Sequence, residues 1–157
     1  MGDEQGHWSV QGRSRNGRLV MSNFQHAEAR CATRFTDEQI CQAKRLKGLG
    51  LPWIPEAGHF VLDPLGFCPQ PSPFQDRVYF ILNYDYFMKK VGGVDRFKEI
   101  MVWLPTWYDA RQLLRLFDVP DSDVARHLAE QKSIEYGDEL SALLELLTDV
   151  LRQRQTF

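Results

Sequence analysis

The chain has 157 residues, of which 43% are hydrophobic and 25% charged, and this fits one globular domain that can bury a core. It has no apolar run of about 18 residues and no apolar secretory segment at its start, so we expect a soluble protein without a membrane partner. The net charge of −2 is uneven: residues 1–50 hold eight basic and five acidic side chains (+3), and the rest hold eleven and sixteen (−5).

Residues 1–35 are polar and rich in Gly, Arg, Ser and Gln. We expect them to form an N-terminal arm outside a single α+β domain at residues 36–157. The pair Asn16-Gly17 suits a type I′ turn, so a hairpin is one form that the arm can take. The alternative is a chain that starts at Met21, which would make the preceding residues an extension.

The arm is also a candidate contact for nucleic acid, because basic side chains neutralise phosphates. The competing interpretation is an arm that packs against the acidic body or remains free. The candidate nucleic-acid contacts are Arg13, Arg15 and Arg18, helped by Lys44, Arg45 and Lys47.

Cysteine and histidine usage excludes several kinds of site. Cys31, Cys41 and Cys68 are an odd number at unrelated spacings, which argues against a disulfide framework and favours a reducing compartment. We therefore expect a cytoplasmic protein. No cysteine or histidine pair has the close spacing of a zinc site, and no glycine-rich phosphate loop is present, so neither a metal nor a cofactor is expected.

The first helix is predicted at residues 36–50. Thr36 is a suitable N-cap, because its hydroxyl can accept a backbone N–H of the first turn. Asp37 and Glu38 complement the positive end of the helix dipole, and Gly48 is a typical stop.

Residues 51–74 hold six of the eight prolines. Proline fixes φ and lacks an N–H, so we expect a loop with at most a short strand at residues 59–62. His59, Asp63 and Cys68 gather in this loop as a candidate catalytic set, since an imidazole can take a thiol proton and create a nucleophile. The competing interpretation is a packed loop in which His59 caps a backbone carbonyl.

The middle of the chain alternates strands and short helices. Residues 76–83 are apolar on both faces, which predicts a central strand covered on both sides. Asn83 is the expected N-cap of a helix over residues 84–93, and a helical piece at 94–100 leads to a strand at 101–105. The many aromatic side chains here are expected to be core, because few basic residues are interleaved for nucleic-acid stacking.

The last third is predicted to be helical, over residues 105–117, 122–131 and 138–153. Thr106 is the expected N-cap of the first of these helices, with Asp109 completing a variant capping box. The last helix has a broad apolar face that suits core packing or a partner, including a second copy of the chain. The candidate interface residues are Leu140, Leu143, Leu147 and Leu151.

The stretch LFDVPDSDVARHL, residues 116–128, has the apolar rhythm of a DNA-binding helix-turn-helix. Its turn lacks glycine, and Leu114 stands where a small residue would ease a close crossing. The would-be recognition helix is rich in acidic residues, which repel phosphate. We therefore predict an ordinary helical corner.

Together these features predict an α+β fold: a small, mostly antiparallel sheet of two to four strands packed against helices, with a helical C-terminal third and a basic N-terminal arm. No catalytic signature is present, so we expect a non-enzymatic interaction or accessory module with a protein partner or a homodimer. The alternatives are nucleic-acid contact through the arm and a small enzyme built on the loop residues.

Overall fold

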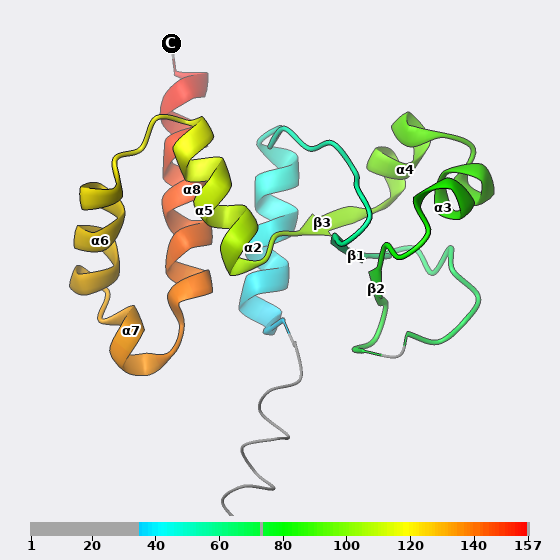
Figure 1. Ribbon diagram of the computed structural model, residues 1–157, viewed down its shortest axis with the longest axis horizontal. Helices are drawn as coiled ribbons and strands as arrows, with labels where there is room; N and C mark the ends of the chain where they lie inside the picture. The colour runs from blue at the N-terminus through cyan, green and yellow to red at the C-terminus, as the bar shows by residue number, and fades with distance from the viewer. Residues whose placement is uncertain (1–34, 73, 157) are drawn as a thin grey trace, which may run out of the picture. The chain divides into compact units, whose positions relative to one another are not determined.

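The computed structural model describes residues 35–72 and 74–156 of the chain (Figure 1). These residues form seven helices and one antiparallel sheet of three strands, which confirms the expected α+β class. The elements are α2 (Asp37–Gly48), β1 (Phe60–Leu62), β2 (Val78–Phe80), α3 (Tyr84–Val91), α4 (Val94–Ile100), β3 (Val102–Leu104), α5 (Trp107–Leu116), α6 (Asp121–Glu130), α7 (Ser133–Tyr136) and α8 (Glu139–Gln155).

The sheet has the order β2-β1-β3, so the short strand in the Pro-rich segment is its centre. Val61 pairs with Tyr79 on one side and with Trp103 on the other, both antiparallel. The expectation that residues 76–83 form the central strand is wrong: β2 is an edge strand of three residues. Leu82 lies beyond it and is 80% exposed.

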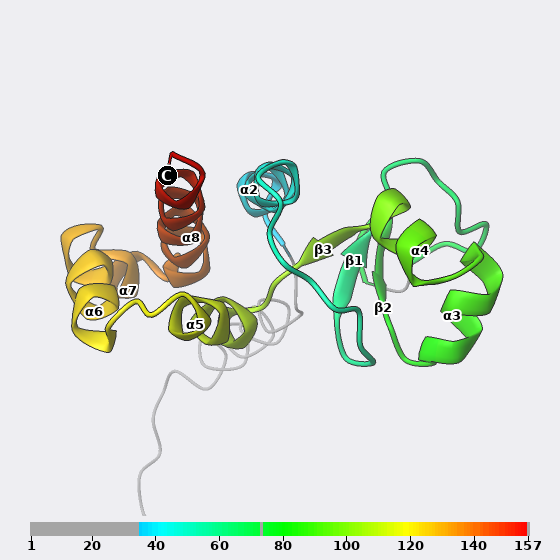
Figure 2. The same cartoon turned by 90° about the horizontal axis from the view of Figure 1, so that it is seen from above.

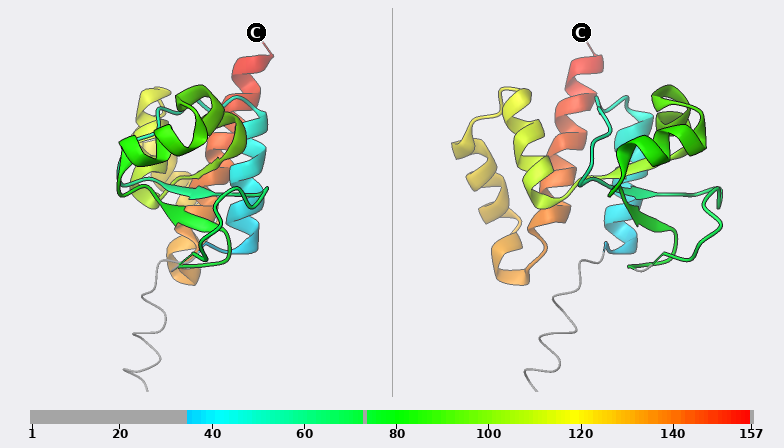
Figure 3. Two further views of the ribbon diagram at one scale, coloured as in Figure 1. Left: turned by 90° about the vertical axis from the view of Figure 1, so that its right-hand side faces the viewer. Right: turned by 45° about the vertical axis from the view of Figure 1, so that its right-hand side comes forward.

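The two faces of the sheet bury different cores, because side chains alternate along each strand. One face packs Val61 and Trp103 into the larger core, which includes Phe97 of α4 and Leu143 of α8. The other face contributes to a smaller core under α2, with members Phe35, Ala43, Leu62, Val78, Val102 and Leu104. Figures 2 and 3 show α2 on one side of the sheet and α3 and α4 on the other.

The C-terminal helices assemble around α8. α2 lies beside α8, and α5 and α6 each pack against α8 as well (Figures 1 and 2). Arg111 and Arg115 of α5 form ion pairs with Asp121 at the start of α6, at 2.8 and 3.5 Å. Residues 116–128 thus form a corner whose helices rest on a third helix.

Local capping explains where several helices begin. The hydroxyls of Thr36 and Thr106 accept the backbone N–H groups of Gln39 and Asp109, respectively. In turn, the side chains of Gln39 and Asp109 accept the backbone N–H of the capping threonine, which completes a capping box at each helix start. Asn83 accepts the backbone N–H of Tyr86 in α3. These three predicted caps are confirmed. Within the described ranges, no helix is both long and apolar enough to cross a membrane.

Candidate functional site

The Pro-rich segment after β1 is organised by a buried carboxylate. Asp63 is fully buried, and its Oδ2 accepts the backbone N–H of Cys68 at 2.7 Å. Asp63 also joins its backbone to β2, since its N–H donates to the Arg77 carbonyl at 2.9 Å. The Tyr79 hydroxyl donates to the Gln70 carbonyl at 2.7 Å, so the far end of the loop is attached to the same strand.

This environment holds the Cys68 thiol in its protonated form. Burial, followed by the charge of Asp63 and a hydrogen bond to its side chain, raises the pKa of Cys68 to about 11. Because the thiolate is the nucleophile, a raised pKa opposes nucleophilic chemistry at neutral pH. Asp63 and Cys68 therefore come together, as a carboxylate that accepts the Cys68 backbone N–H and lies beside a neutral thiol.

His59 is engaged elsewhere. Its Nδ1 accepts the indole N–H of Trp53 at 3.1 Å and faces the backbone N–H of Glu56 at 3.3 Å. Its ring also lies 5.0 Å from the Trp103 ring, on the aromatic side of the larger core. The competing interpretation expected His59 to cap a backbone carbonyl; its ring instead contacts an indole N–H and a backbone N–H. These contacts leave the Asp63–Cys68 pair without the imidazole that the catalytic hypothesis needs.

Cys68 instead lines a groove between the Pro-rich loop and α3. The groove has a volume of about 280 Å³ and is mainly apolar. Tyr79 of the edge strand forms part of it, and Phe87 and Val91 of α3 join it from the helix. Its full lining is Phe67, Cys68, Pro69, Gln70, Pro71, Tyr79, Tyr86, Phe87, Lys90 and Val91.

The rim of the groove exposes aromatic surface beside a positive charge. Phe67 is 45% and Tyr86 53% exposed to solvent. The Lys90 ammonium lies 5.7 Å from the centre of the Tyr86 ring, which suits a cation–π contact. Lys90 is also the one charged residue in the lining. The groove can therefore receive an apolar group next to an anionic one.

The sequence contains an indication of this exposed rim, although we expected the aromatic residues of this region to be core. Tyr86 and Lys90 are four residues apart, so they share one face of α3. The buried residues of that helix are Met88 and Val91, which belong to its apolar stripe, and Tyr86 lies off that stripe. An aromatic residue off the apolar stripe indicates exposed surface, but the loop opposite it cannot be placed from local sequence.

Two of the three basic residues of α2 contact or face polar groups of the protein itself. The Lys47 ammonium donates to the carbonyls of Glu99 and Met101 at 2.6 and 2.8 Å, which ties α2 to the junction of α4 and β3. Arg45 lines a polar cavity between α2 and α8 that also contains three carboxylates. Lys44 is exposed. The other candidate nucleic-acid contacts, Arg13, Arg15 and Arg18, lie outside the described residues, as does the possible hairpin.

The candidate interface leucines of α8 belong to the protein's own core. Leu143 and Leu147 are fully buried and Leu151 is 6% exposed, while Leu140 is half-buried against both cores. This corrects the idea that they present a surface for a second chain.

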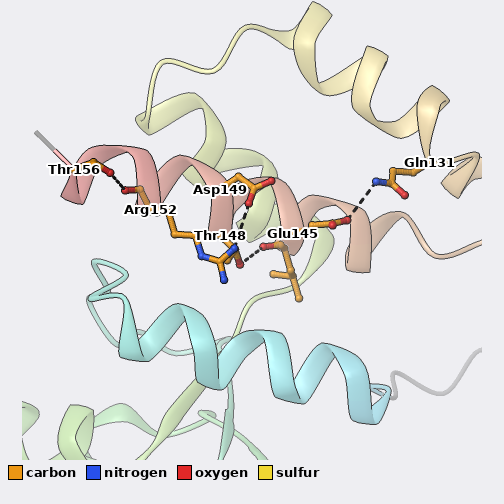
Figure 4. A network of polar contacts seen from close by, with 7 residues as sticks. Gln131, Glu145, Thr148, Asp149, Arg152 and Thr156 are labelled. Atoms are coloured by element: carbon orange, nitrogen blue, oxygen red, sulfur yellow. Dashed lines mark hydrogen bonds and ion pairs between the residues drawn. The ribbon is translucent and has the colours of Figure 1, made fainter.

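The outer surface of α8 is polar. Arg152 pairs with Asp149 at 3.6 Å, and Gln131 donates to Glu145 at 3.4 Å (Figure 4). Thr148, which is 2% exposed, lies on the buried side instead, and its hydroxyl donates to the Leu144 carbonyl of the same helix at 2.8 Å. The buried leucines and the exposed polar side chains indicate that this helix packs mainly against its own chain.

In the part of the chain that the structure describes, no three His, Cys, Asp or Glu side chains are grouped to hold a metal ion. Cys41 and Cys68 are both free thiols there. Comparisons with known protein families, with curated proteins and with solved structures find no match. The groove must therefore be interpreted from its own chemistry.

Proposed function

We propose that this protein is a non-enzymatic binding module, and that the groove between the Pro-rich loop and α3 receives a short segment of a partner protein. The segment would place an apolar or aromatic side chain in the groove and an acidic side chain at its rim. The observation that carries the proposal is the apolar groove with an exposed aromatic rim. Exposed apolar surface in a concave site is typical of recognition.

The positive charge at the rim of the groove favours an acidic side chain in the partner segment. Lys90 lies at the rim, and Lys89 precedes it in the last turn of α3. An acidic side chain close to Lys90 would form a favourable pair, and complementary charge mainly sets specificity and the rate of association. The aromatic walls would supply most of the affinity, because aromatic anchors dominate binding surfaces of this kind.

A binding role also agrees with the chemistry of the groove. The thiol that lines it is protonated at neutral pH, since the pKa of Cys68 is raised to about 11. His59 is occupied by Trp53. The proposal keeps the protein in the cytoplasm, where free cysteines at unrelated spacings are common.

The test uses the full chain and a library of random peptides displayed on phage. We expect the selected peptides to combine an aromatic or large aliphatic residue with Asp or Glu. Lys90→Glu should weaken a selected peptide at least about tenfold, which corresponds to about 1.4 kcal/mol. Tyr86→Ser should weaken the same peptide, because it removes half of the aromatic rim.

Two matched variants serve as controls. Lys89→Glu changes the same charge one residue away, outside the groove lining, and Tyr136→Ser removes another exposed tyrosine on α7. Both should bind as the unmodified chain does. The proposal fails if no peptide is enriched, or if selected peptides bind the groove variants and the control variants equally well.

A further inference from the structure

A second cavity lies between α2 and the segment that follows it. Its volume is about 350 Å³, within the range of roughly 300–1,000 Å³ typical of small-molecule sites. It shares no lining residue with the groove described above. The lining consists of Ala43, Lys47, Gly50, Leu51, Pro52, Trp53, Lys98 and Trp103.

Two tryptophans contribute to the lining of this cavity. The rings of Trp53 and Trp103 are stacked, with centres 5.8 Å apart and planes 8° from parallel. Trp53 is held in place because its indole N–H donates to His59. Both indoles are more than 90% buried and therefore fixed, so the parts that reach the cavity offer a ligand aromatic contact at little cost in conformational entropy.

The indole N–H of Trp103 is an unused donor. Trp103 is only 9% exposed, and its Nε1 is buried without a hydrogen-bond partner among the described residues. Buried indole N–H groups nearly always have a partner, because an unpaired buried donor costs free energy. Trp103 lines this cavity and also one beside His59 and Asp109, and its Nε1 has almost no accessible surface, so a ligand could reach this donor only if a neighbouring side chain moved.

The charged residues of the lining are both cationic. Lys47 donates to two backbone carbonyls, and an ammonium group has three donors, so one remains. The acidic group that acts on Lys47 is Glu99, whose carboxylate is already paired with Arg96 at 2.8 Å. Lys98 is exposed at the edge of the cavity. The lining therefore holds positive charge that no carboxylate of its own neutralises.

We propose that this cavity binds a small planar anion: an aromatic ring that carries a carboxylate or a phosphate group. The ring would lie against the indole lining, and the anionic group would lie near Lys47 and Lys98. This ligand class matches the aromatic lining and the positive charge together.

The test follows the indole N–H signals of the full chain by nitrogen-15 NMR. The chain has four tryptophans, so each signal can be assigned with single Trp→Phe variants. The probes are indole-3-acetate, AMP and inorganic phosphate. We expect at least one aromatic probe to move the Trp103 signal with a Kd below about 1 mM, and phosphate alone to leave it in place. The stronger aromatic probe identifies carboxylate or phosphate as the anionic group.

Charge variants separate this site from general attraction of anions. Lys98→Glu should weaken the aromatic probe at least about tenfold. Lys89→Glu, which makes the same change in the last turn of another short helix, should leave the affinity unchanged. The proposal is overturned if no probe moves the Trp103 signal at about 10 mM, if phosphate alone gives the full shift, or if Lys98→Glu and Lys89→Glu behave alike.

Discussion

The buried carboxylate of Asp63 accepts the backbone N–H of Cys68, five residues later, at 2.7 Å. The same carboxylate faces the Cys68 thiol, whose pKa is raised to about 11 by burial first and by Asp63 second. One acidic side chain thus shapes the Pro-rich loop and adds to the effect of burial in keeping its cysteine protonated.

Slow alkylation of Cys68 is the first expected consequence. At pH 8 about one thiol in a thousand is ionised when the pKa is about 11, against about one in four for an ordinary cysteine. In a chain with Cys31→Ser and Cys41→Ser, iodoacetamide should modify the folded protein roughly a hundredfold more slowly than the urea-unfolded protein. Asp63→Asn should speed the folded reaction, because it removes a charge that raises the thiol pKa. Equal rates for the folded and unfolded chains would contradict the assigned environment.

Stability should also depend on this thiol at high pH. The folded-state pKa of Cys68 lies above its unfolded value, so the neutral thiol stabilises the fold below about pH 8.5. That contribution should be lost as pH rises toward 11. Urea denaturation at pH 8 and pH 10.5 measures the loss, and Cys68→Ser should show a smaller one. An identical pH dependence in the two proteins would rule out this origin.

Removing the loop's acceptor should destabilise the protein. Asp63→Ala leaves the Cys68 N–H without its acceptor, which typically costs about 1–3 kcal/mol of unfolding free energy. Asp76→Ala is a matched control, because Asp76 is an exposed acid in the same loop region. The control should change stability by less than about 0.5 kcal/mol. Urea titrations of both variants provide the comparison.

The cap of α5 offers a test of local helix stabilisation. Thr106→Ala removes the hydroxyl that accepts the Asp109 N–H, and the unfolding free energy should fall by about 1 kcal/mol. Thr106→Ser keeps the hydroxyl and should retain most of that stability. Thermal or urea unfolding distinguishes the two, and a serine variant as unstable as the alanine variant would show that the cap is not responsible.

The leucine face of α8 should govern stability rather than assembly. Leu147 is fully buried, so Leu147→Ala should cost about 2–5 kcal/mol through lost burial and a residual cavity. Glu145→Ala on the outer face should cost less than about 0.5 kcal/mol. Native mass spectrometry should give the same oligomeric state for the unmodified chain and for both variants. A change of state with Leu147→Ala alone would reinstate these leucines as an interface.

Helix starts were predictable because their signals are local. Thr36, Asn83 and Thr106 act as caps through bonds that span only three residues. The place of β2 was not predictable in this way, since both faces of residues 76–83 are apolar and the edge position depends on which strands pair with β1. Helix α7 was not predicted, because it is a single turn of four residues bounded by the left-handed backbone of Lys132 and Gly137.

The candidate site shows the same limit. The sequence located the loop that lines the groove, and it brought His59, Asp63 and Cys68 to attention together. The fold gives them different partners: the His59 imidazole accepts the indole N–H of Trp53, while Asp63 lies beside the Cys68 thiol. Residue spacing does not show which of several possible partners a side chain contacts in the fold.

The Pro-rich loop has one more consequence, for the exposed edge of the sheet. On the side of β2 away from β1, the Val78 N–H donates to the Gln75 carbonyl, and the Val78 carbonyl accepts the Ser72 hydroxyl. An edge strand with free backbone groups is a template on which other chains can add strands. Here the segment that builds the groove also occupies the outward backbone groups of Val78. Damage to this loop would therefore do more than remove a binding site: it would uncover a surface prone to aggregation.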